Sequence, residues 1–395
     1  MGTHIGIGFS QDLDAEIAAK KAALQAKTQL SRNKAHFTLL LTTIHYDPQA
    51  ILPTIREILD ESQIIGCSTG GLILSEKIQM RGILLLSISS DEISVGTAYM
   101  SDLVEHHETE TGINFAKMSL NNFGNQRRDA FLFFVDNQLR TNTFFLRGLQ
   151  QTLGNMFPLV GGTSCDDFRF TNNFQIYEKN ILKNSAVGVL LGGKMGVAVS
   201  SRHGWRPLGK PRFIDKASGN IIHAIDGQPA ANLYREYFDK SMDEIYTGKL
   251  SPLTILYPLG IPIEDKKEYL LRNVIDILPD GSIICQGDVS EGAEVHIMIG
   301  NKESCRQAAM EAAQEVHHTL LGKKAKLIII IESLARLKLL GRMAYQEIAE
   351  IKKILGPDVP LIGMYSHGEF CPVQSRNQFK KTYYQNGSIV ITAIR

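Results

Sequence analysis

The chain has 395 residues, of which 44% are hydrophobic and 21% charged, and its formal net charge at pH 7 is +1. The length predicts two or three domains of an ordinary folded protein. The near-zero charge gives no electrostatic reason to expect nucleic acid or an anionic membrane, and no apolar stretch approaches the roughly 18 residues of a membrane-spanning helix. We therefore expect neither nucleic acid nor a membrane as a partner.

The five cysteines, at positions 67, 165, 285, 305 and 371, are odd in number and form no CxxC pair. That pattern is typical of unpaired thiols in a reducing compartment. The N-terminal residues lack the basic and apolar regions of a signal peptide. The sequence therefore predicts a cytoplasmic protein.

The first part of the chain alternates strand and helix patterns. The helix pattern over 12–30 has acidic residues in its first turn and places Leu13, Ile17 and Leu24 on one face. The apolar runs 83–88 and 93–99 flank a short polar segment, which predicts a hairpin. The other elements predicted for this unit are a strand over 4–9, a strand over 37–41, a helix from Pro48 and a strand at 64–65.

Two further segments repeat this order. For the second unit we predict strands at 93–99, 131–135 and 158–160, helices over 108–120 and from Thr141 or Asn142, and closing strands at 170–177 and 186–191. For the third unit we predict strands at 295–299, 327–331 and 360–362, helices over 305–320 and 344–355, and a final strand at 388–394. The repetition indicates one βαβαβ plan used three times.

The segment between the second and third units has a different pattern. Short apolar runs, the turn signal Asp226-Gly227 and a predicted hairpin around residues 279–281 indicate an α+β insertion before the third unit. We predict an α/β fold of two domains, built from three related units with mixed sheets flanked by helices. The expected modules cover residues 1–215 and 216–395.

Each unit ends its last apolar run in small and polar residues, at 65–71, 160–167 and 362–369. Glycine lets the backbone approach a ligand closely, and exposed N–H groups can surround an anion. Ligands of open α/β sheets favour the crevice beyond the carboxyl ends of strands. The alternative is that each glycine only makes a tight turn. A single turn favours that alternative, whereas three equivalent turns leave both interpretations open.

Four segments, taken in this order along the chain, resemble the FIST domain family. They are Ile65–Gly71, Phe157–Gly162 followed by Asp166, Ile225–Ala230 followed by Tyr234, and Pro360–Glu369 followed by Asn386, with Arg272 and Arg336 between them. The resemblance implies a FIST N-terminal module and a FIST C-terminal module of the prokaryotic stand-alone type. It also implies a sensory role, in which a small molecule, with amino acids proposed as ligands, is bound and the signal is relayed. The family's His-Asn pair is Gln385-Asn386 here, so no role is assigned to a histidine at that position.

The ligand-binding hypothesis assigns partners to both charges of an amino acid. The resemblance favours Asp166 and Glu369 as carboxylates for the ammonium group, and Arg272 and Arg336 are candidates for a bidentate clamp on the ligand's carboxylate. The structural alternatives are a turn cap for Asp166, an ion pair for Glu369 and a surface position for Arg272, and Asp167 is better explained as a turn residue. The predicted ligand-binding residues are Ser68, Thr69, Gly70, Gly161, Gly162, Thr163, Asp166, Arg272, Tyr365, Ser366, Gly368, Glu369 and Asn386.

The cysteines near the strand ends raise an alternative function. Cys67 or Cys165 would serve as the nucleophile of a small-molecule hydrolase or transferase, and His367 lies close to Cys371 in the sequence. Buried, inert thiols are the simpler explanation. Neither HExxH nor CxxC is present, so we expect no metal and no cofactor.

The leading hypothesis is a cytoplasmic small-ligand sensor without a chemical step. Its signal would pass to a separate output protein, because the sequence carries no kinase, cyclase, chemotaxis or F-box segment. The enzyme described above is the second hypothesis, and an interaction scaffold that binds no ligand is the third.

Overall fold

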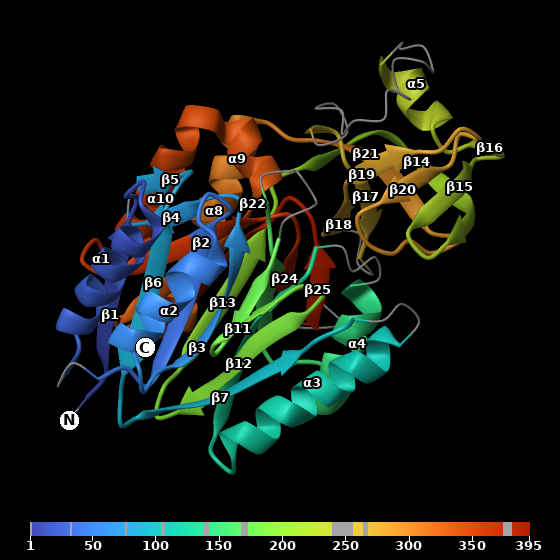
Figure 1. Cartoon of the computed structure of the whole chain (residues 1–395). Helices are drawn as coiled ribbons and strands as arrows, with labels where there is room; N and C mark the ends of the chain where they lie inside the picture. The colour runs from blue at the N-terminus through green and yellow to red at the C-terminus, as the bar shows by residue number, and fades with distance from the viewer. Residues whose placement is uncertain are drawn as a thin grey trace.

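The computed structural model describes residues 2–31, 34–75, 77–103, 107–137, 142–166, 173–238, 256–263, 268–373 and 381–395. Within these ranges, three six-stranded sheets share one core, and a smaller body projects to one side (Figure 1). The predicted α/β class with mixed sheets flanked by helices is confirmed.

The first unit follows the predicted order. It consists of β1 (His4–Ser10), α1 (Ala15–Thr28), β2 (Phe37–Thr43), α2 (Pro48–Ile58), β3 (Gln63–Thr69), β4 (Leu72–Leu74), β5 (Lys77–Gln79) and β6 (Ile83–Ser89). Asp14 caps α1 by accepting a hydrogen bond from the Ile17 backbone N–H at 2.8 Å. The face that carries Leu13, Ile17 and Leu24 is exposed, while the alanines of α1 pack inward.

The second unit repeats the plan. It consists of β7 (Ile93–Met100), α3 (Glu108–Phe123), β8 (Arg128–Val135), α4 (Asn142–Leu153), β9 (Leu159–Thr163), β10 (Gln175–Tyr177), β11 (Asn180–Leu182) and β12 (Ala186–Gly193). The expected hairpin between β6 and β7 is wrong, because β6 pairs with β1 and β2 while β7 pairs with β12 in another sheet. The predicted cap Thr141 and residues 170–172 of the predicted strand lie outside the described residues.

The third unit is interrupted by the insertion. It consists of β13 (Val197–Arg202), α8 (Lys302–Thr319), β22 (Leu327–Ser333), α9 (Leu334–Leu340), a 3₁₀ turn (Gly341–Met343), α10 (Ala344–Leu355), β23 (Leu361–Ser366), β24 (Glu369–Val373), β25 (Lys381–Gln385) and β26 (Ile389–Ile394). Its first strand is β13, which pairs with β26, and the predicted strand 295–299 belongs to the insertion instead. The insertion therefore follows the first strand of this unit.

The insertion has its own sheet and core. Its elements are β14 (Arg206–Ser218), β15 (Ile221–Ile225), β16 (Gln228–Pro229), α5 (Asn232–Phe238), β17 (Leu259–Pro262), β18 (Tyr269–Arg272), β19 (Val274–Ile277), β20 (Ile283–Cys285) and β21 (Glu294–Ile299). The turn at Asp226-Gly227 is confirmed, with positive φ angles of 48° and 73°. The expected domain boundary near residue 215 falls inside β14.

Each of the three main sheets borrows a hairpin from another unit. The strand orders are β1-β6-β2-β3-β10-β11, β7-β12-β8-β9-β24-β25 and β13-β26-β22-β23-β4-β5. The hairpin β10-β11 of unit two thus completes the sheet of unit one, and β24-β25 of unit three completes the sheet of unit two. The hairpin β4-β5 of unit one completes the sheet of unit three. This cyclic exchange locks the units together, and it brings the segments that follow β3, β9 and β23 to one place.

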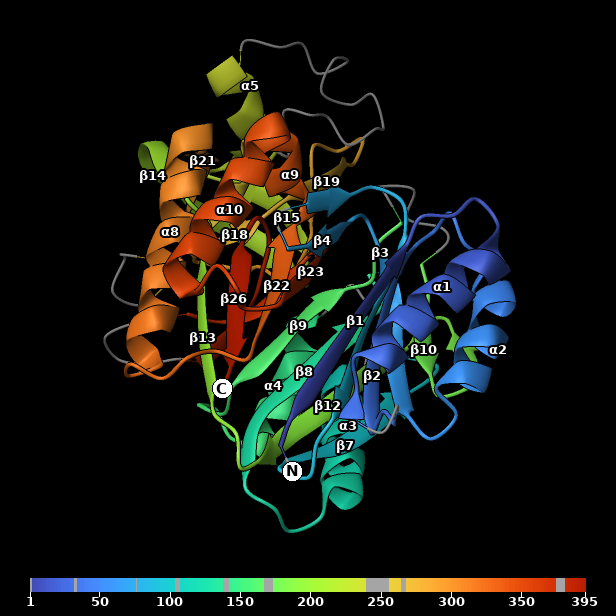
Figure 2. The ribbon, with the colours of Figure 1, turned by 90° about the vertical axis from the view of Figure 1, so that its left-hand side faces the viewer.

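The two faces of each sheet pack against different cores. In β22, for example, Ile329 and Ile331 face the core shared by all three sheets, whereas Ile328 and Ile330 contact the helices of their own unit. The helices α1 and α2, α3 and α4, and α8 and α10 therefore cover the outer faces (Figure 2).

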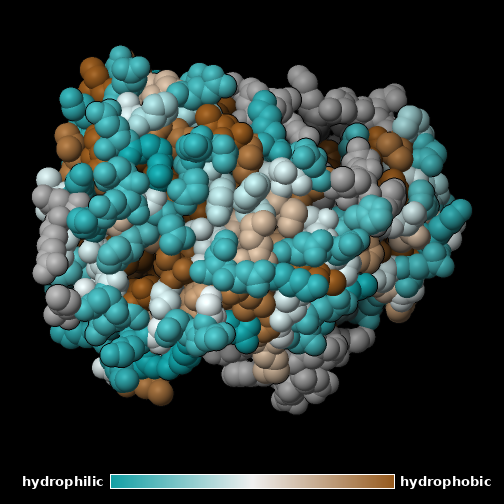
Figure 3. Space-filling model, turned by 60° about the horizontal axis from the view of Figure 1, so that its bottom comes forward, coloured by the Kyte–Doolittle hydropathy of each residue, from teal (hydrophilic) through white to brown (hydrophobic). Residues whose placement is uncertain are grey.

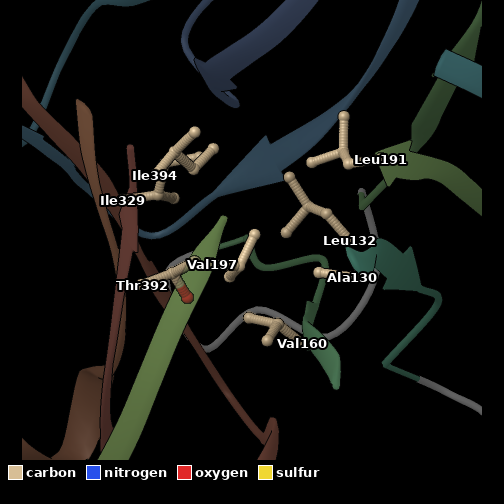
Figure 4. A pocket seen from close by; sticks show the side chains of 8 residues that line it. All are labelled: Ala130, Leu132, Val160, Leu191, Val197, Ile329, Thr392 and Ile394. Atoms are coloured by element: carbon tan, nitrogen blue, oxygen red, sulfur yellow. The ribbon is translucent and has the colours of Figure 1, made fainter. Parts of the chain in front are cut away.

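A small apolar cavity lies in the shared core. Figure 4 shows side chains that line it, among them Leu132, Val197 and Ile329. Its volume of about 10 Å³ is on the scale of a single water molecule. This cavity is too small for a metabolite.

The close contact between β1 and α1 allows a direct test of the packing. A Cβ at Gly8 would lie 1.8 Å from the Ala22 carbonyl oxygen. Gly8→Ala is therefore expected to cost about 1–3 kcal/mol of unfolding free energy, measured by urea denaturation. Gly2 has no atom within 4 Å of the same position, so Gly2→Ala is the matched control and should change little. Equal effects of the two variants would contradict this packing.

The surface carries scattered apolar side chains. On the face shown in Figure 3, hydrophobic atoms are interspersed among hydrophilic ones. In the part of the chain that the structure describes, no helix combines the length and the apolar character needed to cross a lipid bilayer.

Candidate functional site

The stretches that the sequence indicated as turns are largely strand residues. Gly66, Gly161 and Gly363 occupy equivalent registers, each paired with the neighbouring parallel strand of its unit. A Cβ at these positions would lie 2.0, 2.2 and 2.4 Å from a carbonyl oxygen of that strand. These glycines are therefore explained by close strand contact rather than by turn geometry.

The end of β3 contacts the ends of β9 and β23, the equivalent strands of the other two units. The Gly70 N–H donates to the Tyr365 carbonyl at 3.1 Å, and the Tyr365 N–H donates to Gly71 at 2.9 Å. The Cys165 N–H donates to the Ser68 carbonyl at 3.0 Å. The structure thus brings together predicted site residues from all three units. We call this meeting of the segments 68–71, 163–166 and 365–369 the three-strand junction.

The ends of β9 and β23 also contact each other at the junction. The Thr163 N–H donates to the Gly368 carbonyl at 2.8 Å, and the Gly368 N–H donates to Thr163 Oγ1 at 3.0 Å. Thr69 Oγ1 donates to the Tyr365 carbonyl at 2.9 Å. These groups, which we expected to face a ligand, already have partners within the junction. Recognition there would therefore depend on side chains.

A histidine lies between a thiol and a carboxylate at the junction. His367 Nε2 is 3.9 Å from Asp166 Oδ1, and the Cys165 thiol also interacts with the imidazole. All three residues are buried. Burial alone would lower the pKa of His367, but Cys165 and Asp166 raise it to about 9. The imidazole therefore holds its proton at neutral pH.

The side chain of Glu369 is buried and accepts two hydrogen bonds. Its Oε1 accepts a hydrogen bond from Ser366 Oγ at 2.9 Å, and its Oε2 accepts one from the Ser388 N–H at 3.0 Å. Burial raises the pKa of Glu369 to about 8 despite these hydrogen bonds. At neutral pH this side chain is mostly uncharged, which makes it a weaker partner for an ammonium group than Asp166.

Behind the junction lies a buried charge cluster around Arg336. Its guanidinium contacts Glu332 at 3.0 Å and Glu347 at 2.5 Å, and it donates to the His203 and Cys305 carbonyls at 2.6 and 3.1 Å. Arg336 and both glutamates are 0–1% exposed. Burial raises the pKa of Glu347 well above its usual range, so this acid is neutral beside the remaining ion pair.

Arg272 and Asn386 lie where the insertion meets the third unit. Arg272 Nε donates to the Asp288 carbonyl at 2.8 Å, and Nη1 donates to the Leu271 and Tyr384 carbonyls at 2.9 and 3.1 Å. Asn386 Oδ1 accepts a hydrogen bond from the Asn273 N–H at 3.1 Å. These bonds attach the end of β18 to β25 and to the segment after it. We assign this contribution to Arg272 in place of the expected carboxylate clamp and to Asn386 in place of the expected ligand contact.

Sequence reasoning missed the pairing of Cys165 with His367. It compared His367 with Cys371, a sequence neighbour, whereas the Cys371 side chain belongs to the shared core. Cys165 and His367 come from different units but lie at the same distance after the equivalent Gly161 and Gly363. The repeat register was therefore the signal that could have found them.

The described side chains show no metal centre. Within the ranges given above, no group of three or more His, Cys, Asp or Glu side chains is placed to hold a metal ion. Asp167 lies outside the described residues.

Comparison with known protein families agrees with the repeat architecture. The FIST N domain matches residues 36–228, and the FIST C domain matches residues 230–372. The chain belongs to the FIST family. FIST domains are generally associated with sensing in signal transduction. The three-strand junction of this FIST protein combines residues from both matched domains.

Relatives of this FIST chain occur in bacteria and archaea. An uncharacterized protein of Mycobacterium bovis is 24% identical over 95% of each chain, and one of Mycobacterium tuberculosis is 23% identical over 95% of this chain and 96% of its own length. An uncharacterized protein of Methanocaldococcus jannaschii is 24% identical over 70% of this chain. The match covers 57% of the length of that archaeal relative.

Solved structures resemble the FIST chain only distantly. Cyanuric acid hydrolase from A. caulinodans covers 100% of this chain and 99% of its own, with a TM-score of 0.42 and 7% identity. Phosphoribosylformylglycinamidine synthase II from Thermotoga maritima covers 99% of this chain and 72% of its own, with a TM-score of 0.21 and 11% identity. Likeness at this level carries no conclusion about chemistry.

Proposed function

We propose that this FIST protein is a small-molecule sensor of intracellular signal transduction, with an amino acid as ligand and a separate protein as output. The meeting of all three strand ends at one junction is the observation that supports it most. A ligand at that place would contact Ser68 of the first unit, Asp166 of the second and His367 of the third. Binding there would bias how the N-terminal and C-terminal modules are arranged, and so the surface offered to a partner.

The charges at the junction suit a zwitterion. Asp166 supplies a carboxylate for an ammonium group, and the protonated His367 supplies a cation for a carboxylate. In this proposal His367 takes the role that was expected of the backbone N–H groups and Arg272, because His367 brings a positive charge to the junction itself. The five buried, unpaired cysteines are compatible with a reducing compartment.

Thermal unfolding with single amino acids at millimolar concentration tests the proposal. A ligand present at 100 times its Kd adds about 2.7 kcal/mol to the unfolding free energy and raises Tm. Asp166→Asn should lose this response because it removes the charge that faces the ammonium group. Asp129→Asn, which removes a carboxylate paired with Arg127 near the start of β8, should keep it.

The outcomes separate the hypotheses. No Tm shift with any amino acid would exclude amino-acid sensing and leave the scaffold hypothesis in place. A shift that Asp166→Asn preserves would place the ligand elsewhere in the molecule.

A further inference from the structure

One repeat position of the junction carries a different residue in each of the three units. Four residues beyond the equivalent glycines stand Gly70, Cys165 and His367, so the first unit has no side chain there, the second a thiol and the third an imidazole. A Cβ at Gly70 would lie 2.8 Å from Cys165 Sγ. The absence of a side chain in unit one therefore provides the space that the thiol of unit two occupies.

Cys165 differs from the other four cysteines in its surroundings. Burial raises the pKa of Cys67, Cys285, Cys305 and Cys371, which keeps those thiols protonated and unreactive. Cys165 instead contacts the protonated imidazole of His367. An imidazole in contact with a thiol can hold the proton of that thiol, as the base of a Cys–His pair does.

The imidazole also has an orienting group. Asp166 Oδ1 lies 3.9 Å from His367 Nε2, and its carboxylate is 0% exposed. A nucleophile, a base beside it and a carboxylate that orients the base form the arrangement used in nucleophilic catalysis. The thiol and the carboxylate follow one another in the chain, while the histidine arrives from the C-terminal module.

We propose that the three-strand junction is an acyl-transfer site, in which Cys165 is the nucleophile, His367 transfers the proton and Asp166 positions the imidazole. This activity goes beyond ligand sensing, because it adds a covalent step that sensing does not need. The substrate class is a small neutral acyl compound, an ester or an amide. A neutral compound fits because the cluster already contains an anionic carboxylate, and a small one fits because all three side chains are buried.

The reaction balances with water as the second substrate. In the resting site the proton of the Cys165 thiol is already held by His367, and the sulfur forms a bond to the carbonyl carbon. Collapse of the tetrahedral intermediate breaks the bond from that carbon to the leaving oxygen or nitrogen, which takes the proton from His367. Water then attacks the thioester and gives a proton to His367. The carbon–sulfur bond breaks, the acid is released, and His367 keeps the proton beside the free sulfur, as in the resting site.

The experiment uses the full chain with p-nitrophenyl acetate as the acyl donor. We expect a burst of p-nitrophenolate stoichiometric with protein, and mass spectrometry should find the acetyl group on the peptide that contains Cys165. His367→Gln should slow acetylation about 100-fold or more, the scale of general acid–base catalysis. Cys67→Ser is the matched control, because Cys67 is an equally buried thiol at the end of β3 and should not affect the burst.

Asp166→Asn tests the positioning role separately. It should change the pH profile of acetylation while the acetyl group still appears on Cys165, whereas a purely structural residue would leave that profile unchanged. The thermal transition of each variant shows whether it is folded.

Three results would overturn the proposal. They are a folded wild-type chain without a burst, acetylation of Cys67 or of lysines at the same rate as Cys165, and an unchanged rate in folded His367→Gln. None of them bears on amino-acid sensing, which is measured by thermal shift without an acyl donor. Conversely, acetylation of Cys165 without any amino-acid Tm shift would remove the sensor and leave the acyl-transfer site.

Discussion

Arg336→Met is expected to destabilise the protein by about 3–5 kcal/mol, because it removes the only cation that contacts Glu332 and Glu347 among the residues the structure describes. The guanidinium is fully buried and also satisfies the carbonyls of His203 and Cys305. Methionine fills a similar volume but leaves a buried carboxylate unpaired and two carbonyls without this donor. Urea denaturation at neutral pH measures the change in unfolding free energy.

A second arginine with two glutamate partners provides the matched control. Arg306 contacts Glu303 and Glu350, but it lies at the surface, with a side chain that is 25% exposed. Arg306→Met should therefore cost much less than Arg336→Met. The triple variant Arg336→Met/Glu332→Leu/Glu347→Leu should recover much of the lost stability, since replacing all the buried charges removes the unpaired carboxylate. Similar losses for the two arginines would contradict the importance we assign to burial.

Glu369→Gln is expected to gain stability relative to wild type as the pH rises. Burial raises the pKa of Glu369 from the ordinary glutamate value of 4.5 to about 8, so between these values the folded state holds a proton that the unfolded state has lost. Raising the pH therefore removes stability from the wild type through this window, and the loss is complete above pH 8. Glutamine resembles the neutral acid and does not titrate.

The size of the effect follows from the shift. At about 1.4 kcal/mol per pH unit, the stability of Glu369→Gln minus that of wild type should increase by roughly 4 kcal/mol between about pH 5 and pH 8. Urea denaturation at both pH values measures it, and contributions of groups such as His203 and His367 cancel in the difference. Glutamine can direct its carbonyl to the Ser388 N–H and its amide to the Ser366 hydroxyl, so the shape of the site is kept.

Glu303→Gln is the control for this pH experiment. Glu303 lies in the first turn of α8 with a side chain that is 68% exposed, and its substitution should leave the pH dependence unchanged. Stability differences for Glu369→Gln that stay constant from pH 5 to pH 8 would mean that Glu369 is ionised in the folded protein at neutral pH.

The local elements of the fold could be predicted because their signals lie within a few neighbouring residues. For example, α10 follows from the helical spacing of Ile348, Ile351 and Leu355. The strand β22 follows from the apolar run 327–331. The face of α1 could not be predicted in this way. Leu13, Ile17 and Leu24 share a face of the helix pattern, but that face is exposed, and the alanines pack inward against the closely placed β1.

Strand partners were decided by long-range pairing. The runs 197–202 and 295–299 are both strands, and only their hydrogen-bond partners show that the first opens the third unit while the second belongs to the insertion. The exchange of hairpins among the sheets is likewise invisible in any single unit. The sequence of a strand does not show which other strand its backbone will form hydrogen bonds with.

The candidate site divides in the same way. The residues alone indicate that three equivalent strand ends carry small and polar residues, and that Asp166, Ser366 and Glu369 lie among them. Which of these groups face one another depends on how the three units pack together. The cyclic exchange of hairpins sets Cys165 and Asp166 beside His367, where they raise its pKa, and burial raises the pKa of Glu369. Proximity and dielectric environment are properties of the packed molecule, because they depend on residues that are distant in the chain.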